Sequence, residues 1–215
     1  MTRTSVIFDV DGVLIDSYQA HYQSWLKMFA EHGVSFTEAE FRKTFGRTSH
    51  DIIAALYGAE LSDNDICAWD DRKEALYRDI IRERFPAIDG AVELLDHLHS
   101  AGFRLAVGSS GPPENIALTL ECLQRAPIFG AVVTRVDVTR GKPDPQVFQI
   151  AAERLGAQPT ECVVVEDAPA GIEAANRAGM ASVALTGTAT RAELAHAVLV
   201  VDSLRELTPE RLRSL

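Results

Sequence analysis

Cysteine is scarce in this chain of 215 residues, which contains three of them. They lie far apart, as Cys67, Cys122 and Cys162, and no CxxC pair is present. An odd number of widely separated cysteines predicts neither a disulfide framework nor a zinc site. We therefore expect reduced thiols, most of them packing residues, in a cytoplasmic protein.

Long apolar runs and an excess of basic residues are also missing. No apolar run approaches the roughly 20 residues that a membrane-spanning helix requires. The first apolar run already contains Asp9 and Asp11, which is unlike a signal peptide. The formal net charge of −10 disfavours nucleic-acid binding, which depends on a basic surface. We expect no membrane or nucleic-acid partner, and among oligomeric states a monomer is favoured.

Short apolar runs that alternate with helical patterns predict the fold. The runs typical of buried strands cover 4–9, 103–108, 131–134, 162–165, 182–185 and 198–201. The helical patterns cover 91–100, 115–123, 145–155 and 170–178. This alternation predicts right-handed βαβ units and a parallel sheet with helices on both faces. The expected fold class is therefore α/β, with a Rossmann-like core.

A stretch of purely helical patterns interrupts this alternation after the first strand. Helices are expected over 18–31, after a capping box at 37–40, over 49–58 with Ser49 as the cap, and from 62 toward Pro86. We therefore predict an α/β core domain formed by residues 1–16 and 87–215, and a small helical domain formed by residues 17–86.

Polar residues gather at the ends of four predicted strands, which is where ligands bind in a parallel sheet. The first group is Asp9-Val10-Asp11-Gly12, and strand alternation would direct Asp9 and Asp11 to the same side. One carboxylate can attack phosphorus and form an acyl phosphate. A second can protonate the leaving oxygen and later deprotonate water. A solvated turn is the alternative, since Asp and Gly are common turn residues.

The longer motif around these acids resembles a known family. Phe8-Asp9-Val10-Asp11-Gly12-Val13-Leu14-Ile15-Asp16-Ser17 is similar to the first signature of the haloacid dehalogenase superfamily in its phosphatase form. The remaining signatures follow in the expected order, so the resemblance extends over the whole chain. It implies that Asp9 is the nucleophile and Asp11 the general acid and base. The dehalogenase and phosphonate-cleaving members lack the second aspartate, so Asp11 favours phosphate esters.

Two further groups follow the second and third strands. Ser109-Ser110-Gly111 precedes a helix, where hydroxyl and backbone N–H groups can bind an anion, although a simple helix cap is the alternative. The resemblance implies that Ser109 donates to the transferring phosphoryl group, with Ser110 and Gly111 beside it. It also implies that Lys142, in Gly141-Lys142-Pro143, neutralises phosphoryl and nucleophile oxygens. A solvated surface lysine is the alternative for Lys142 by itself.

The acid pair Glu166-Asp167 closes the fourth strand. Acids buried at this position need a partner, and Mg²⁺ is suitable because it prefers carboxylate and carbonyl oxygens. The resemblance implies a Mg²⁺ ion held by the Asp9 carboxylate, the backbone carbonyl of Asp11 and this acid pair, with Asp167 as the closer ligand.

The helical insertion resembles the C1-type cap of the subfamily that includes β-phosphoglucomutase and phosphoglycolate phosphatase. Residues 45–50 are similar to the cap loop that faces the substrate in that subfamily, which implies substrate contacts from Gly46, Arg47 and His50. His21 lies where relatives carry a histidine near the site. Surface positions are the alternative for Arg47, His50 and His21.

These features together predict a Mg²⁺-dependent phosphatase that acts on a sugar phosphate or another small phosphorylated metabolite. A phosphosugar mutase of the β-phosphoglucomutase type is the first alternative. It is disfavoured because Arg47 is displaced from the mutase arginine position and residues 111–115 depart from the mutase pattern. A non-catalytic binding protein is disfavoured by the intact acids and lysine, and a haloacid dehalogenase by Asp11.

Overall fold

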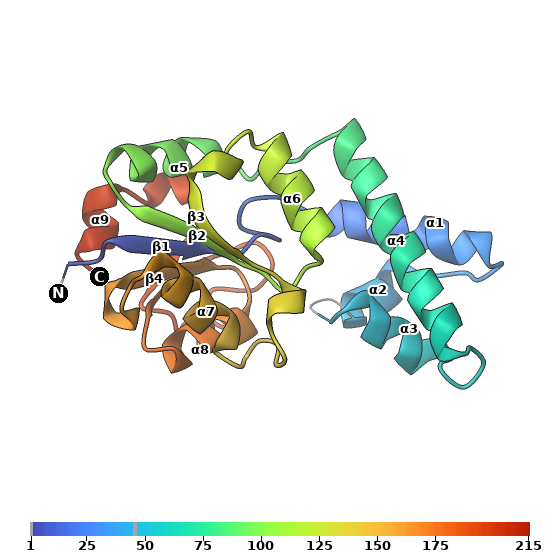
Figure 1. Cartoon of the computed structure of the whole chain (residues 1–215). Coiled ribbons are helices and arrows are strands. Elements are labelled where there is room, and N and C mark those ends of the chain that lie inside the picture. The colour runs from blue at the N-terminus through green and yellow to red at the C-terminus, as the bar shows by residue number, and fades with distance from the viewer. Residues whose placement is uncertain (1, 45–46) are drawn as a thin grey trace. The chain divides into compact units, whose positions relative to one another are not determined.

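The computed structural model describes residues 2–44 and 47–215. The chain divides into two compact units (Figure 1). The first unit comprises Met1–Asp16 and Pro86–Leu215, and the second comprises Ser17–Phe85. The sequence predicts these boundaries after residues 16 and 86.

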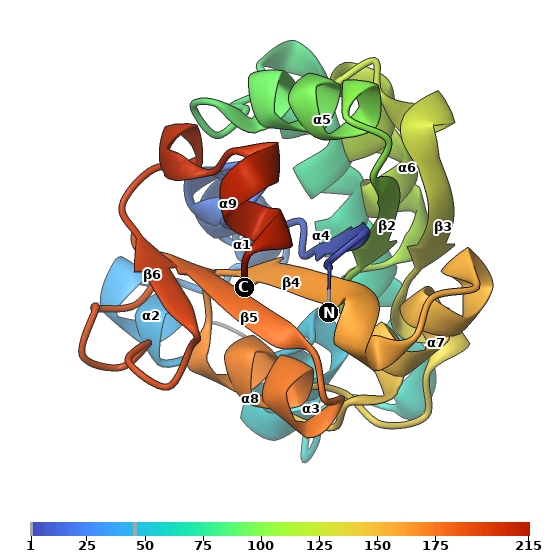
Figure 2. The same cartoon turned by 90° about the vertical axis from the view of Figure 1, so that its left-hand side faces the viewer.

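A six-stranded parallel sheet forms the centre of the first unit (Figures 1 and 2). Its strand order is β3-β2-β1-β4-β5-β6, and every neighbouring pair runs parallel. The strands are β1 (Ser5–Phe8), β2 (Arg104–Gly108), β3 (Phe129–Val133), β4 (Cys162–Glu166), β5 (Ala181–Leu185) and β6 (Leu199–Val201). The predicted α/β fold class is confirmed.

Helices cover both faces of this sheet. Figure 1 shows α5 and α6 on one side and α7 and α8 on the other. The α-helices are α5 (Ala91–Ser100), α6 (Pro113–Cys122), α7 (Gln146–Leu155), α8 (Pro169–Arg177) and α9 (Pro209–Arg213). Short 3₁₀ turns are η1 (Ala126–Ile128), η2 (Arg135–Asp137), η3 (Pro159–Glu161) and η4 (Leu204–Glu206). Because helices cover both faces of the sheet, β1, β4 and β5 are buried along their whole length and have near-continuous apolar sequences.

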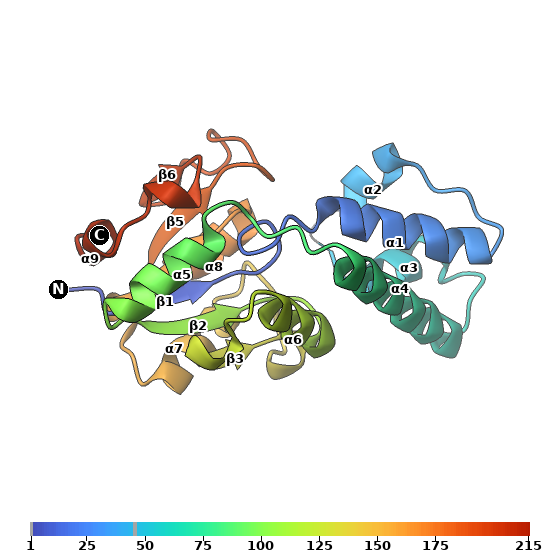
Figure 3. The ribbon, with the colours of Figure 1, turned by 90° about the horizontal axis from the view of Figure 1, so that it is seen from above.

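In the described part of the second unit, four helices surround an aromatic core. They are α1 (Tyr18–Glu31), α2 (Glu38–Thr44), α3 (Ser49–Tyr57) and α4 (Asp63–Glu83), and α1 and α4 run side by side (Figure 3). Trp25, Phe29 and Phe36 are buried at its centre, where the ring centroids of Phe29 and Phe36 lie 4.7 Å apart. The unit therefore has an apolar core of its own.

A side chain caps the N-terminus of α2, α3 and α4. The predicted capping box before α2 is present, since the Thr37 amide donates to Glu40 Oε2 over 2.7 Å. The expectation that Ser49 caps α3 is wrong: Thr48 is the N-cap and accepts from the Asp51 amide. Ser49 is instead buried, and its hydroxyl donates to Glu74 Oε1 over 2.5 Å. Serine and threonine can both cap a helix. Here the Ser49 hydroxyl is bound to the buried Glu74 carboxylate on α4, and Thr48 caps α3.

Within residues 2–44 and 47–215, none of the helices has both the length and the apolar character needed to cross a bilayer.

Candidate active site

Three buried acids meet at the carboxyl ends of β1 and β4. Asp9 directly follows β1, Glu166 ends β4, and Asp167 comes next. Each offers one carboxylate oxygen, and these three oxygens all lie within 4.8 Å of one another. Because β1 and β4 are neighbours in the sheet, acids that are far apart in the sequence lie close together in the structure.

Lys142 supplies the positive charge that faces these acids. Its Nζ donates to Asp9 Oδ1 over 2.5 Å and to Glu166 Oε1 over 2.7 Å. Burial acts to lower the pKa of Lys142, but the charges of Asp9 and Glu166 and the two hydrogen bonds raise it overall. The ammonium therefore stays protonated at neutral pH.

One lysine does not balance three carboxylates. Burial, with the negative charges of Glu166 and Asp11, raises the pKa of Asp9 to about 7 although Lys142 acts to lower it. Burial and the charges of Glu166 and Asp9 likewise raise the pKa of Asp167. Crowded carboxylates of this kind call for a further cation, and an all-oxygen donor set suits Mg²⁺. The residues present therefore fit the predicted metal.

Glu166 is fixed in place by three N–H donors. Its Oε1 accepts from Lys142, and its Oε2 accepts from the backbone amides of Asp167 and Ala168, both over 2.8 Å. Gly171 in α8 leaves room for this carboxylate, because a Cβ there would lie 1.7 Å from Glu166 Oε1. The acid that ends β4 thus orients Lys142 and the start of α8.

Asp11 lies in a tight turn beyond the end of β1. Gly12 has φ +75°, and its amide donates to the carbonyl of Ile15 over 2.8 Å. The prediction that strand alternation directs Asp9 and Asp11 to the same side is wrong in its reason, since β1 ends at Phe8. The two acids are nevertheless close enough for the charge of Asp11 to raise the pKa of Asp9.

Ser109 follows β2, the strand on the other side of β1. It is buried, its amide donates to the Val133 carbonyl over 3.0 Å, and its Oγ accepts from the Gly111 amide over 3.0 Å. The hydroxyl proton can therefore be donated to a phosphoryl oxygen. Ser110 is exposed and Gly111 is half-buried.

The substrate residues predicted in the second unit fall in different environments. Arg47 is exposed, and its Nη2 donates to the Asp51 carbonyl over 3.1 Å. His50 is exposed on α3. Gly46 lies outside the described residues. His21 on α1 stacks on Tyr77, with ring centroids 4.2 Å apart.

His21 also belongs to a buried polar group that was not predicted. Lys73 Nζ lies 2.9 Å from His21 Nδ1 and donates to Glu74 Oε1 over 2.9 Å. Both charged side chains are less than a tenth exposed. A signal was present in the sequence, because positions 66, 70, 73, 74, 77 and 81 share the helical spacing of one face and include polar and apolar residues alike.

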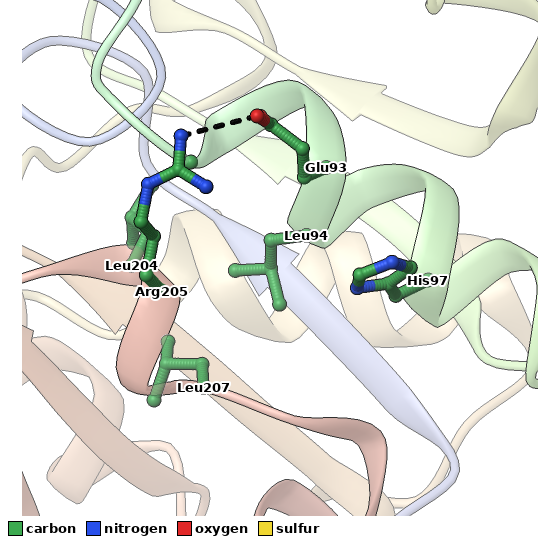
Figure 4. A pocket seen from close by; sticks show the side chains of 7 residues that line it. Glu93, Leu94, His97, Leu204, Arg205 and Leu207 are labelled. Carbon is green, nitrogen blue, oxygen red and sulfur yellow. Dashed lines mark hydrogen bonds and ion pairs between the residues drawn. The ribbon is translucent and has the colours of Figure 1, made fainter.

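A separate pocket of about 100 Å³ lies between α5 and the segment 204–207 (Figure 4). Arg205 on its rim donates to both carboxylate oxygens of Asp89, over 2.7 Å each, and to Glu93 over 3.1 Å. These acids neutralise the guanidinium, so the pocket offers no surplus positive charge to a phosphate. It shares no residue with the strand-end site, by which we mean Asp9, Asp11, Ser109, Lys142, Glu166 and Asp167.

Comparisons with known proteins relate this chain to a family of hydrolases. A family model described as haloacid dehalogenase-like hydrolase matches residues 6–185. The chain is 35% identical to validoxylamine A 7'-phosphate phosphatase of Streptomyces hygroscopicus subsp. limoneus, with 94% of each chain covered. It is 34% identical to hexitol phosphatase A of Escherichia coli strain K12, with 94% of this chain and 92% of the relative covered.

Two solved structures share the fold over nearly the whole chain. The structure of CbbY from Rhodobacter sphaeroides in complex with phosphate has a TM-score of 0.89 at 25% identity, with full coverage of both chains. The structure of β-phosphoglucomutase from Clostridium difficile has a TM-score of 0.86 at 26% identity and covers 99% of this chain and 96% of its own.

Proposed function

The chain belongs to the haloacid dehalogenase-like hydrolase family, and we propose that it is a phosphatase that hydrolyses a phosphomonoester of a sugar, a polyol or a similar carbohydrate. The resemblance inferred from the sequence motifs is thereby confirmed. Similar proteins include a validoxylamine A 7'-phosphate phosphatase, a hexitol phosphatase and a phosphorylated carbohydrates phosphatase, and their names support this substrate class.

One observation carries the proposed chemistry: the buried Asp9 carboxylate is held at 2.5 Å by the Lys142 ammonium, within a cluster of acids suited to a metal. A carboxylate positioned by a fixed cation can attack a phosphoryl group that the same cation neutralises.

The reaction proceeds in two displacements at phosphorus. Asp9 attacks, the bond from phosphorus to the leaving oxygen breaks, and Asp11 gives its proton to that oxygen. Asp11 then takes a proton from a water molecule, whose oxygen attacks phosphorus and breaks the bond to Asp9. Ser109 and Lys142 donate to the phosphoryl oxygens throughout. The products are the alcohol and inorganic phosphate, and Asp9 is regenerated.

The residues that would hold Mg²⁺ are the Asp9 carboxylate, the Asp11 carbonyl and Asp167, with Glu166 completing the acidic set. When bound, Mg²⁺ neutralises negative charge on the phosphoryl oxygens and on the nucleophile. Lys142 and Ser109 then have the narrower role of orienting those oxygens.

The helical residues 17–86 select the substrate in this proposal, as a cap domain on the core of 1–16 and 87–215. Gly46, Arg47, His50 and His21 contact the carbohydrate part, which differs between substrates, while Ser110 and Gly111 lie beside the phosphoryl group. The enzyme acts as a cytoplasmic monomer, and its three free cysteines fit a reducing compartment.

The test is release of inorganic phosphate from a panel of fructose 1-phosphate, a hexitol phosphate, other phosphorylated carbohydrates and p-nitrophenyl phosphate, with Mg²⁺ present. We expect turnover that chelation with EDTA removes and that Asp9→Asn lacks. A folded protein that releases no phosphate from any member of the panel would contradict the proposal.

A phosphosugar mutase is the second candidate, because the fold is also similar to that of β-phosphoglucomutase. The two differ in product. With β-glucose 1-phosphate as the substrate, a mutase forms glucose 6-phosphate without free phosphate, whereas the proposed phosphatase forms glucose and phosphate.

A further inference from the structure

Asp167 is positioned differently from its neighbour Glu166. Glu166 is fixed by Lys142 and two backbone amides. The Asp167 carboxylate, only 4% exposed, lies against the segment that follows β5. β5 pairs in parallel with β4, so this segment leaves the sheet at the same edge as the acid pair.

Thr188 in that segment faces the Asp167 carboxylate. The chain turns at Gly187, which has φ +137°, a value that favours glycine. Burial and the charges of Glu166 and Asp9 raise the pKa of Asp167, and hydrogen bonding with the Thr188 side chain acts to lower it.

Gly12 provides the space in which these two groups meet. A Cβ on Gly12 would lie 1.9 Å from Asp167 Oδ2 and 2.9 Å from Thr188 Oγ1. Any side chain at position 12 would therefore collide with the carboxylate and the hydroxyl together. Three segments meet at this point: the turn after β1, the end of β4 and the segment after β5.

We propose that Thr188 is a positioning residue for the metal site, and that its hydroxyl holds the Asp167 carboxylate in the orientation that binds Mg²⁺. This inference rests on the proposed function, because it requires that the acid cluster binds the metal. A partner that hydrogen bonds to a metal-ligating carboxylate fixes its rotamer before the metal arrives, and loss of such a partner typically weakens metal binding about 10- to 100-fold.

Three variants separate the hydroxyl from the shape of the side chain. Thr188→Val keeps the volume and the branching at Cβ but removes the hydrogen bond. Thr188→Ser keeps the hydroxyl. Thr190→Val is the matched control, because Thr190 lies in the same loop and its hydroxyl donates instead to Glu193 Oε2 over 2.6 Å.

The readout is the affinity of the full-length protein for Mg²⁺ alone, measured by titration calorimetry without substrate. We expect Thr188→Val to bind Mg²⁺ at least about tenfold more weakly than wild type. Thr188→Ser and Thr190→Val should stay close to wild type. In phosphate release, saturating Mg²⁺ should restore the kcat of Thr188→Val, since no group that touches the substrate has been removed.

The possible failures can be told apart. Equal Mg²⁺ affinity of wild type and Thr188→Val would overturn the role of Thr188 and leave the phosphatase proposal intact. Equal weakening in Thr188→Val and Thr188→Ser would also overturn it, because the hydroxyl would then not matter. A wild-type protein that neither binds Mg²⁺ nor releases phosphate would overturn the proposed function and this inference with it.

Discussion

Asp9 and Asp11 are two residues apart, but they differ in surroundings and in proposed role. Asp9 is 7% exposed and accepts a hydrogen bond from Lys142, whereas Asp11 is half-buried in a turn. Asp11→Asn should lower kcat/KM by about 10²- to 10⁴-fold on a sugar phosphate, because a general acid contributes that much to the departure of a poor leaving group.

The loss of kcat/KM in Asp11→Asn should be smaller on p-nitrophenyl phosphate, whose leaving group departs without a proton. Steady-state kinetics on both substrates provide the measurement. Equal losses on the two substrates would mean that Asp11 does not protonate the leaving oxygen.

Glu74, which lies outside the strand-end site, shows how a buried charge contributes to the stability of the fold. Burial acts to raise the pKa of Glu74, but the charges of Lys73 and His21 and the hydrogen bonds from Lys73 and Ser49 lower it to about 2. Because this value lies below the ordinary 4.5, the stabilisation from Glu74 is present above pH 4.5 and is lost as the pH falls toward 2.

Glu74→Ala should lower the free energy of unfolding by about 3–5 kcal/mol at pH 7, because it leaves Lys73 buried without its carboxylate. Urea denaturation followed by circular dichroism provides the measurement. Glu38→Ala is the control, since its pair with Arg42 is exposed and such pairs contribute little to stability. A loss as small as that of the control would show that Lys73 finds another partner.

At the scale of elements, the turn from β4 into α8 depends on close packing of Glu166 against Gly171. Gly171→Ala favours the helix by about 1 kcal/mol, but its Cβ would overlap Glu166 Oε1. The shifted carboxylate would misplace Lys142, and a displacement of about 1 Å can cost up to about 10²-fold in rate.

We therefore expect Gly171→Ala to lose kcat by up to about 10²-fold without a matching loss of thermal stability. Phosphate release and thermal unfolding, measured side by side, test this expectation. Glu173→Ala in the same helix removes only an exposed pair with Arg177 and should keep full activity. Full activity in Gly171→Ala would show that Glu166 can move without disturbing Lys142.

Elements with a strong local pattern could be predicted closely from the sequence. The bounds of α1 and α5 agree with the predicted ranges, because their apolar spacing and flanking glycines act locally. Ser49 was misassigned as a cap, because its buried partner Glu74 is 25 positions away in the sequence. Thr188 carried no signal at all, since a threonine in a polar loop gains a role only when the sheet brings β4 and β5 together.

At the scale of the whole molecule, the cluster of Asp9, Glu166 and Asp167 makes the stability of the protein depend on pH and on metal binding. The pKa of Asp9 is raised from its ordinary value of 3.8 to about 7, so its contribution to stability is present below pH 3.8 and is lost as the pH rises through about 7. Above that pH the acids repel one another, and a bound cation relieves the repulsion.

Mg²⁺ should therefore raise the thermal unfolding temperature more at pH 8 than at pH 5.5. Thermal unfolding with saturating Mg²⁺ and with EDTA at each pH gives the comparison. Asp167→Asn should reduce the metal-dependent shift at pH 8. Equal shifts at both pH values in the wild-type protein would mean that Mg²⁺ binds away from this cluster.

The central claim is that the phosphoryl group is carried on Asp9, and the most direct test is to trap it there. The enzyme is quenched with acid during turnover, the acyl phosphate is reduced with borohydride, and the modified residue is located by peptide mass spectrometry. The account predicts homoserine at position 9 in the wild-type protein and none in unreacted protein. Continued turnover with an unmodified Asp9, or with the modification on another acid, would contradict it.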